Sequence, residues 1–343
     1  MAYKRTLLEC HPTLFCSVVR IEYKISTNMK PNLIWLAASA IGIAAATPLP
    51  RQNAEATRFF TFGNSYTDTT FSPNNTAPSA SNPMGNPSLG TGTTSGGTNW
   101  VGYLTTTQNA SLVLSYNLAV GGATIDNTLV SGNPKDLVSQ VEMFQSTYAD
   151  KGAVPWTGDN AVFGVWIGIN ECVLSSSVLV LMGRLVDVVS SIGNAYSNTD
   201  AETFTPRLIA RYRSLVEKIY RDGGRKFLFL NVPAVSRTPE ILSQGDETAK
   251  SHAKYLAVFN QNVESMVKNF TSSHEDTTTV LYDSWSFMTR VLDSPQEYGF
   301  PNATCIDDDG HSCVWWNSYH PTSKYHRLQA EDMKAHLKPL GAW

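Results

Sequence analysis

Four residues, each in a short polar stretch, have the side chains that ester hydrolysis would need. Such a reaction requires a nucleophile, a base that takes its proton, and donors that hold the developing oxyanion. Ser65 can attack a carbonyl carbon, and His320 can act as the base because a free imidazole has a pKa of about 6.5. We expect the oxyanion donors to be the backbone amides of Ser65 and Gly122 and the uncharged side-chain amide of Asn170.

These residues follow, or precede, elements that the sequence predicts. Aromatic, β-branched and continuous apolar runs predict five strands, at 58–62, 112–119, 161–167, 226–232 and 278–282. Ser65, Gly122 and Asn170 come soon after the first three strands. Because ligands bind outside the carboxyl ends of strands in α/β sheets, this placement suits a site.

Spaced apolar residues predict the helices that should cover this sheet, at 136–148, 175–192, 206–220, 248–270 and 322–337. Residues 72–98 are rich in Ser, Thr, Asn, Gly and Pro and predict a long loop. The apolar segment 175–192 has two interpretations: it packs against the sheet, or it borders the substrate groove. The alternation of strands and helices predicts one α/β domain with a mainly parallel sheet.

Composition narrows the class of protein. The chain has 343 residues, of which 42% are hydrophobic and 16% charged, as in a globular protein with a sizeable core. A net charge of -3 disfavours nucleic acid as a partner. We expect no metal and no cofactor, because no HExxH and no paired-cysteine zinc spacing occurs. The absence of G-x-S-x-G disfavours an α/β-hydrolase elbow.

The amino-terminal region predicts secretion to the extracellular space. Residues 29–46 have a basic start, a short apolar run and a small-residue end, which is typical of a signal peptide. The run is shorter than the roughly 20 residues of a membrane span, so we expect no stable membrane anchor. Residues 1–28 are interpreted as an upstream extension, whether translated or not, and 47–343 as a single domain, expected to be a monomer.

Sequons and cysteines agree with secretion. The candidate glycan sites, all expected on surface loops, are Asn74, Asn109, Asn269 and Asn302. Cys305 and Cys313 close a small loop and are predicted to form a disulfide. Cys172 remains, and we interpret it as a small buried hydrophobic residue.

In order, Ser65, Gly122, Asn170 and His320 resemble the four named positions of the GDSL serine hydrolases, also called SGNH. The resemblance covers nearly all of the mature chain. It implies a three-layer α/β/α sandwich with a flavodoxin-like sheet. Residues 62–68 (FGNSYTD) and 315–322 (WWNSYHPT) are most similar to the fungal acetylesterases of carbohydrate esterase family sixteen. Plant-type GDSL esterases and secreted lipases share most of these features.

Three residues depart from the family pattern. Asn64 occupies the position at which the family usually has an aspartate before the serine. Glu171 is a mild change of the acidic residue that follows the asparagine in the family. Most important, Asn317 replaces the acid that orients the catalytic histidine and stabilises its imidazolium form. Asn317 can accept from the ring N–H of His320, but it supplies no charge.

Several arrangements could therefore hold His320. The site is a Ser65–His320 dyad helped by Asn317 or a backbone carbonyl, or it is weakened. An acid from elsewhere, such as Asp283 or the run 307–309, is a further alternative.

Three functions follow from this pattern. The first is an acetylesterase that deacetylates plant cell-wall oligosaccharides, or another small acyl ester, through an acyl-enzyme on Ser65. A lipase or phospholipase for longer acyl esters is the second, and a glycan-binding protein that has lost catalysis is the third.

Tryptophan and histidine side chains occur near the proposed site. Trp166, Trp315 and Trp316 are substrate-binding candidates, because they could stack on a sugar ring or equally serve in packing. The other carboxyl-terminal histidines are interpreted as exposed, namely His311, His326 and His336.

Overall fold

The computed structural model describes residues 6–10, 16–20, 56–171 and 200–343. The chain divides into two units, residues 1–49 and residues 50–343, and each is described by itself. In the first unit, β1 (Thr6–Cys10) pairs antiparallel with β2 (Cys16–Arg20). The predicted signal peptide, the predicted helix at 175–192 and Cys172 lie outside the described residues.

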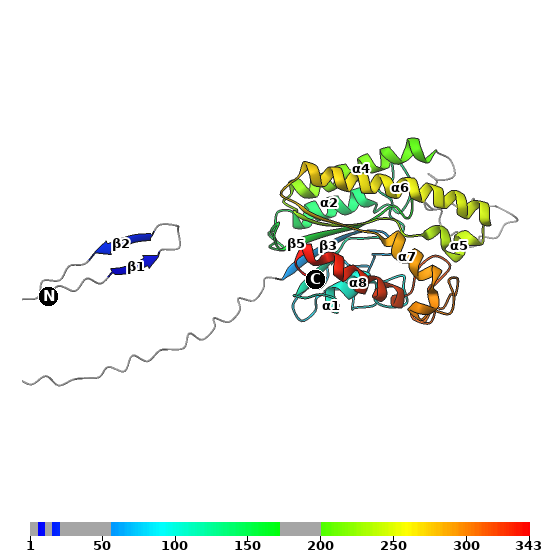
Figure 1. The fold of residues 1–343 in the computed structure, drawn as a ribbon, viewed down its shortest axis with the longest axis horizontal. Helices are drawn as coiled ribbons and strands as arrows, with labels where there is room; N and C mark the ends of the chain where they lie inside the picture. Colours follow the sequence, from blue (N-terminus) through cyan, green and yellow to red (C-terminus); the bar gives the residue numbers. More distant parts are fainter. Residues whose placement is uncertain (1–5, 11–15, 21–55, 172–199) are drawn as a thin grey trace, which may run out of the picture. The chain divides into compact units, whose positions relative to one another are not determined.

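A five-stranded parallel sheet forms the centre of the second unit (Figure 1). Its strands are β3 (Thr57–Gly63), β4 (Val113–Asn117), β5 (Ala161–Trp166), β6 (Lys226–Leu230) and β7 (Thr278–Tyr282). They lie in the order β4-β3-β5-β6-β7, and every neighbouring pair is parallel. This is the flavodoxin-like order, so the predicted fold class is confirmed.

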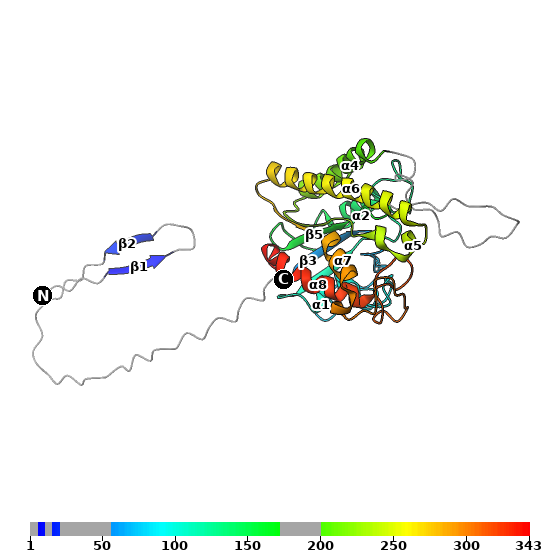
Figure 2. The same ribbon diagram turned by 45° about the vertical axis from the view of Figure 1, so that its right-hand side comes forward.

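Helices cover both faces of the sheet (Figures 1 and 2). One face carries α2 (Leu137–Tyr148), α4 (Ala201–Arg221) and α6 (Asp246–Ser273), and the other carries α1 (Trp100–Thr106) and α8 (Ser323–Leu337). The shorter helical segments are η1 (Val235–Arg237), α5 (Pro239–Leu242), α7 (Ser284–Asp293), η2 (Pro295–Tyr298) and η3 (Lys338–Leu340). None of the described helices is both long and apolar enough to span a membrane.

Local sequence explains where helix α4 begins and why some helices were not predicted. Helix α4 begins before Pro206, because the Asp200 side chain accepts a hydrogen bond from the Thr203 N–H and caps the helix there. Helices α1, α5 and α7 were not predicted. Helix α1 has seven residues, five of them buried, so it shows no alternation between an apolar and a polar face.

The order of the strands places the site. Strand β3 lies between β4 and β5, where the direction of the strand order reverses. Open α/β sheets bind ligands at this switch point, outside the carboxyl ends of the strands. Buried aromatic side chains fix β3 there, since Phe59, Phe60 and Phe62 are all fully buried. The residues that follow β3, β4 and β5 therefore meet at one edge of the sheet.

Candidate active site

A tight turn presents Ser65 immediately after β3. Gly63 has a φ of +145°, and a Cβ atom on it would lie 2.2 Å from the carbonyl oxygen of Trp166, so only glycine fits. The Asn64 side chain accepts from the Tyr66 N–H at 3.1 Å, which closes the turn around Ser65. An aspartate could accept in the same way, so the Asn64 departure leaves the turn intact.

His320 lies directly against this serine. Its Nε2 is 2.8 Å from Ser65 Oγ, although the two residues are 255 positions apart. The turn before α8 brings the ring there, because the Trp316 N–H donates to the His320 carbonyl oxygen at 2.8 Å. The predicted pair is therefore within hydrogen-bond distance.

Asn317 holds the other side of the ring. Its Oδ1 accepts from the Tyr319 N–H at 2.9 Å and from the His320 N–H at 2.7 Å, and it lies 3.1 Å from His320 Nδ1. Backbone N–H groups only donate, so the atom facing them is the amide oxygen. Nδ1 must then carry the proton, which leaves Nε2 free to accept the proton of the Ser65 hydroxyl.

Within the described ranges, no carboxylate takes the place of Asn317 beside His320. Asp283 accepts from the Ser286 N–H and from Asn231, and Asp309 accepts from the backbone after it, so neither bonds to His320. Burial of the His320 ring lowers its pKa to about 4, because no anion compensates the lost hydration of the imidazolium. Among the described residues, the group beside His320 Nδ1 is therefore the Asn317 amide oxygen and not a carboxylate.

Three N–H donors lie in the segments that follow β3, β4 and β5. Gly122 has a φ of +77°, and neither its N–H nor the Ser65 N–H has an acceptor among the described residues. The buried Asn170 donates from Nδ2 to the Ala123 carbonyl oxygen at 2.7 Å, so its second amide hydrogen remains available. A Cβ on Gly121 would lie 3.7 Å from Ser65 Cβ, which places this loop next to the serine.

Two of the three tryptophan candidates are packing residues. Trp166 and Trp315 are fully buried, and their ring N–H groups donate to backbone carbonyl oxygens at 2.9 and 2.7 Å. Neither ring has a face free for a sugar, whereas Trp316 is partly exposed. The predicted exposure of His326 is also wrong, because it is buried and packs against the ring of Tyr66. The other two histidines, His311 and His336, are exposed as expected.

Several supports of the site were not predicted. Gln140, on α2, makes two hydrogen bonds to the backbone of Gly63. Its Oε1 accepts from the Gly63 N–H, and its Nε2 donates to the Gly63 carbonyl oxygen, both at 2.8 Å. Thr94 donates from Oγ1 to the Ser65 carbonyl oxygen at 2.9 Å. Gln140 could have been found, because its spacing from Leu137 and Phe144 puts a polar amide on the buried face of the helix.

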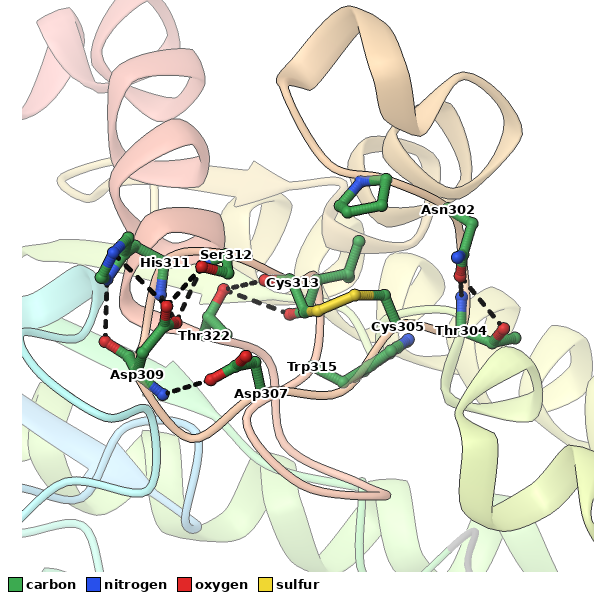
Figure 3. Close-up of a disulfide and its surroundings, with 12 residues drawn as sticks. Asn302, Thr304, Cys305, Asp307, Asp309, His311, Ser312, Cys313, Trp315 and Thr322 are labelled. Atoms are coloured by element: carbon green, nitrogen blue, oxygen red, sulfur yellow. Dashed lines mark hydrogen bonds and ion pairs between the residues drawn. A yellow bond between two sulfur atoms is a disulfide. The ribbon is translucent and has the colours of Figure 1, made fainter.

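The predicted disulfide is present in the segment that leads to His320 (Figure 3). Cys305 and Cys313 are bonded, with their Cα atoms 5.1 Å apart. The Thr322 hydroxyl donates to the Cys313 carbonyl oxygen at 2.8 Å, so the disulfide loop is tied to the residue that caps α8. The loop thereby supports the turn that carries His320.

The sequon asparagines lie in different settings. Asn74 and Asn302 are exposed in loops, and Asn109 is half-buried. Asn269 is exposed but lies on α6, so the expectation of a loop is wrong for this residue. Within the described ranges, no group of three or more His, Cys, Asp or Glu residues is placed to hold a metal ion.

Known proteins resemble this chain over most of its length. The sequence model of the family described as GDSL-like Lipase/Acylhydrolase matches residues 59–333. An acetylesterase from Thermothelomyces thermophilus is 36% identical over 295 residues, which is 84% of this chain and 91% of that protein. A GDSL esterase/lipase from Arabidopsis thaliana is 22% identical over 258 residues, which is 64% of this chain and 66% of that protein.

A solved structure of an acetylxylan esterase from Geobacillus stearothermophilus is a more distant match. It is 14% identical, with coverage of 83% of this chain and 94% of that chain, and the TM-score is 0.44.

Proposed function

Because this chain belongs to the GDSL-like Lipase/Acylhydrolase family and is a serine hydrolase of esters, we propose that it is a secreted acetylesterase of plant cell-wall oligosaccharides. The observation that carries the proposed mechanism is the line of contacts from Ser65 through His320 to Asn317, with distances of 2.8 and 3.1 Å. Such a line is what an activated serine nucleophile requires.

In the proposed first step, Ser65 Oγ attacks the acyl carbon while His320 Nε2 takes the hydroxyl proton. The carbonyl oxygen becomes an oxyanion, which the N–H groups of Ser65 and Gly122 and the Asn170 amide would hold. The oxyanion then collapses, the bond between the acyl carbon and the sugar oxygen breaks, and the imidazolium gives its proton to the departing sugar oxygen. An acetyl group remains on Ser65.

Water completes the proposed cycle. His320 takes one proton from the water, whose oxygen attacks the acetyl carbon and forms a second tetrahedral intermediate in the same oxyanion site. The bond to Ser65 Oγ breaks, the proton goes to that oxygen, and acetic acid leaves. The net reaction consumes one water and yields one alcohol and one acetic acid, which ionises to acetate and a proton.

The substrate class and secretion rest on other observations. The relative with 36% identity is an acetylesterase, and the match spans 84% of this chain. A signal-peptide pattern at 29–46, exposed sequons at Asn74 and Asn302, and the Cys305–Cys313 disulfide are typical of an extracellular protein.

A chain-length series tests the acyl specificity. We expect hydrolysis of p-nitrophenyl acetate to exceed that of the octanoyl ester by at least about tenfold in kcat/KM, and acetylated xylo-oligosaccharides to release acetate. Each methylene that the acyl pocket cannot accommodate changes the transition-state free energy by about 1–3 kcal/mol. Faster turnover of the octanoyl ester would favour a lipase instead.

Exchanging Asn317 for aspartate tests how the base works. Only neutral His320 can accept the proton, so wild-type activity should persist as pH falls and be lost near pH 4. In Asn317→Asp, a carboxylate beside Nδ1 favours the imidazolium and raises the pKa, so the acid limb moves to higher pH. Since Asn317 already sets the tautomer, only the charge is gained, and we expect kcat on the neutral plateau to rise about tenfold.

This experiment needs pH profiles of kcat and kcat/KM for both proteins. Asn262→Asp, a change of amide to carboxylate on α6, is the control and should leave both profiles in place. An unmoved acid limb, with equal or lower kcat in Asn317→Asp, would mean that the site is built around the amide.

A further inference from the structure

The loop that follows β4 carries the Gly122 N–H, and carboxylates hold it on both sides. Before Gly122, the Gly121 N–H donates to Asp68 Oδ2 at 2.8 Å. After it, the Ile125 N–H donates to Glu171 Oε1. We propose that Asp68 and Glu171 are positioning residues that aim the Gly122 N–H at the oxyanion. This inference rests on the proposed function, because it assigns a task within that reaction.

Asp68 uses both of its oxygens as acceptors. Besides Gly121, it accepts from the Thr70 N–H, which lies 2.6 Å from Oδ1. Thr70 has a φ of +54°, a backbone conformation that β-branched residues rarely adopt. The chain thus tolerates an unfavourable conformation while Thr70 donates to one Asp68 oxygen and Gly121 to the other.

An amide cannot replace this carboxylate. Asparagine has the same shape, but one of its two terminal atoms is an NH₂ group that only donates. At position 68 the NH₂ would face either the Thr70 N–H or the Gly121 N–H, and one hydrogen bond would become a repulsive contact of two donors. If Gly121 loses its acceptor, the peptide before Gly122 is free to turn.

Glu171 differs from Asp68, because exchange of its carboxyl group for an amide should preserve its hydrogen bond. It is fully buried, and only Oε1 has a partner, while Oε2 has none among the described residues. Burial raises the pKa of this carboxyl to about 7, so a neutral group suits the position. Glutamine can place its oxygen on the Ile125 N–H and its NH₂ where Oε2 lies, which preserves the contact.

The adjacent Asn170 strengthens this arrangement. Asn170 Nδ2 donates to the Ala123 carbonyl oxygen at 2.7 Å, so two consecutive residues after β5 bind one loop. Oxyanion donors act at about 2.7–3.1 Å from the developing charge, and a misplacement of about 1 Å can cost about 100-fold in rate. Fixing the loop is therefore a requirement of the proposed chemistry as well as of the fold.

The test compares the same carboxylate-to-amide exchange at three positions, with p-nitrophenyl acetate as substrate. We expect kcat of Asp68→Asn to fall by about 10- to 100-fold with KM within about twofold, because the oxyanion exists only in the transition state. Glu171→Gln should lose less than about threefold, and Glu171→Ala at least about tenfold, because alanine removes the acceptor. The control Asp276→Asn changes the contacts with Tyr220 and Arg225 at the other end of the sheet and should keep its kcat.

Several results would overturn the inference. Equal kcat in Asp68→Asn and Asp276→Asn would do so, and so would a change confined to KM or to the melting temperature. If Asp68→Asn does not fold, the Glu171 pair still decides, because equal kcat in Glu171→Gln and Glu171→Ala leaves no positioning role. Failure of the proposed function would give a different result, because the wild type itself would then not hydrolyse the acetate ester.

Discussion

Replacing Ser65 with alanine should lower kcat for p-nitrophenyl acetate by about 10⁴-fold or more. The Ser65 hydroxyl lies 2.8 Å from His320 Nε2, its proton acceptor in the proposed mechanism, and alanine removes the oxygen on which the acyl-enzyme would form. Single removals of a serine nucleophile in other hydrolases have costs of this order, with a residual rate supplied by the oxyanion donors. Initial rates at saturating substrate measure the loss.

A covalent probe separates this role from a structural one. A fluorophosphonate should label the wild type and leave Ser65→Ala unlabelled, while both proteins melt at similar temperatures. Ser265→Ala, which removes an exposed hydroxyl on α6, is the matched control and should be labelled and active. Labelling of Ser65→Ala, or a rate within tenfold of the wild type, would rule out Ser65 as the nucleophile.

Replacing Asn170 with alanine should have the second largest effect, a loss of about 10²–10³-fold in kcat, or about 2.7–4 kcal/mol of transition-state stabilisation. One amide hydrogen of Asn170 bonds to the Ala123 carbonyl oxygen, and the proposed mechanism assigns the second to the oxyanion. Because that hydrogen is used only in the transition state, KM should change little.

The control for Asn170→Ala must match the lost hydrogen bond. Asn262 also donates from Nδ2 to a backbone oxygen, that of Val258 at 2.9 Å, but it lies on α6. Asn262→Ala should keep its kcat, and melting curves of both variants report any loss of stability. If a lower melting temperature accounts for the whole loss of activity in Asn170→Ala, the role of Asn170 is structural.

Much of this site could be predicted because its signals are local. Five strands, four described helices and the disulfide follow from runs, spacing and residue types within short stretches. The site residues Ser65 and His320 were predicted from motifs at the ends of such elements, and the structure brings them together. What local patterns lack is information on which side chain from another element will fill a given hydrogen bond.

The errors have that same origin. Trp166 and Trp315 were placed beside the site by residue type, but neighbouring strands and loops bury both rings completely. His326 was interpreted as exposed from its polarity, yet it packs against Tyr66. Exposure depends on packing between elements, which one helix or loop does not encode alone.

The amino-acid sequence by itself thus determined the class of the fold and the order of the four site residues, because periodicity and motif spacing are properties of the chain. Tertiary structure decided which of the alternatives holds His320, namely an Asn317 oxygen that faces three N–H donors. It also decided that Asp68, three residues after Ser65, reaches the loop of Gly122. The contact of Asp68 with Gly121 joins residues 53 positions apart, and such a hydrogen bond depends on where the folded elements place its two atoms.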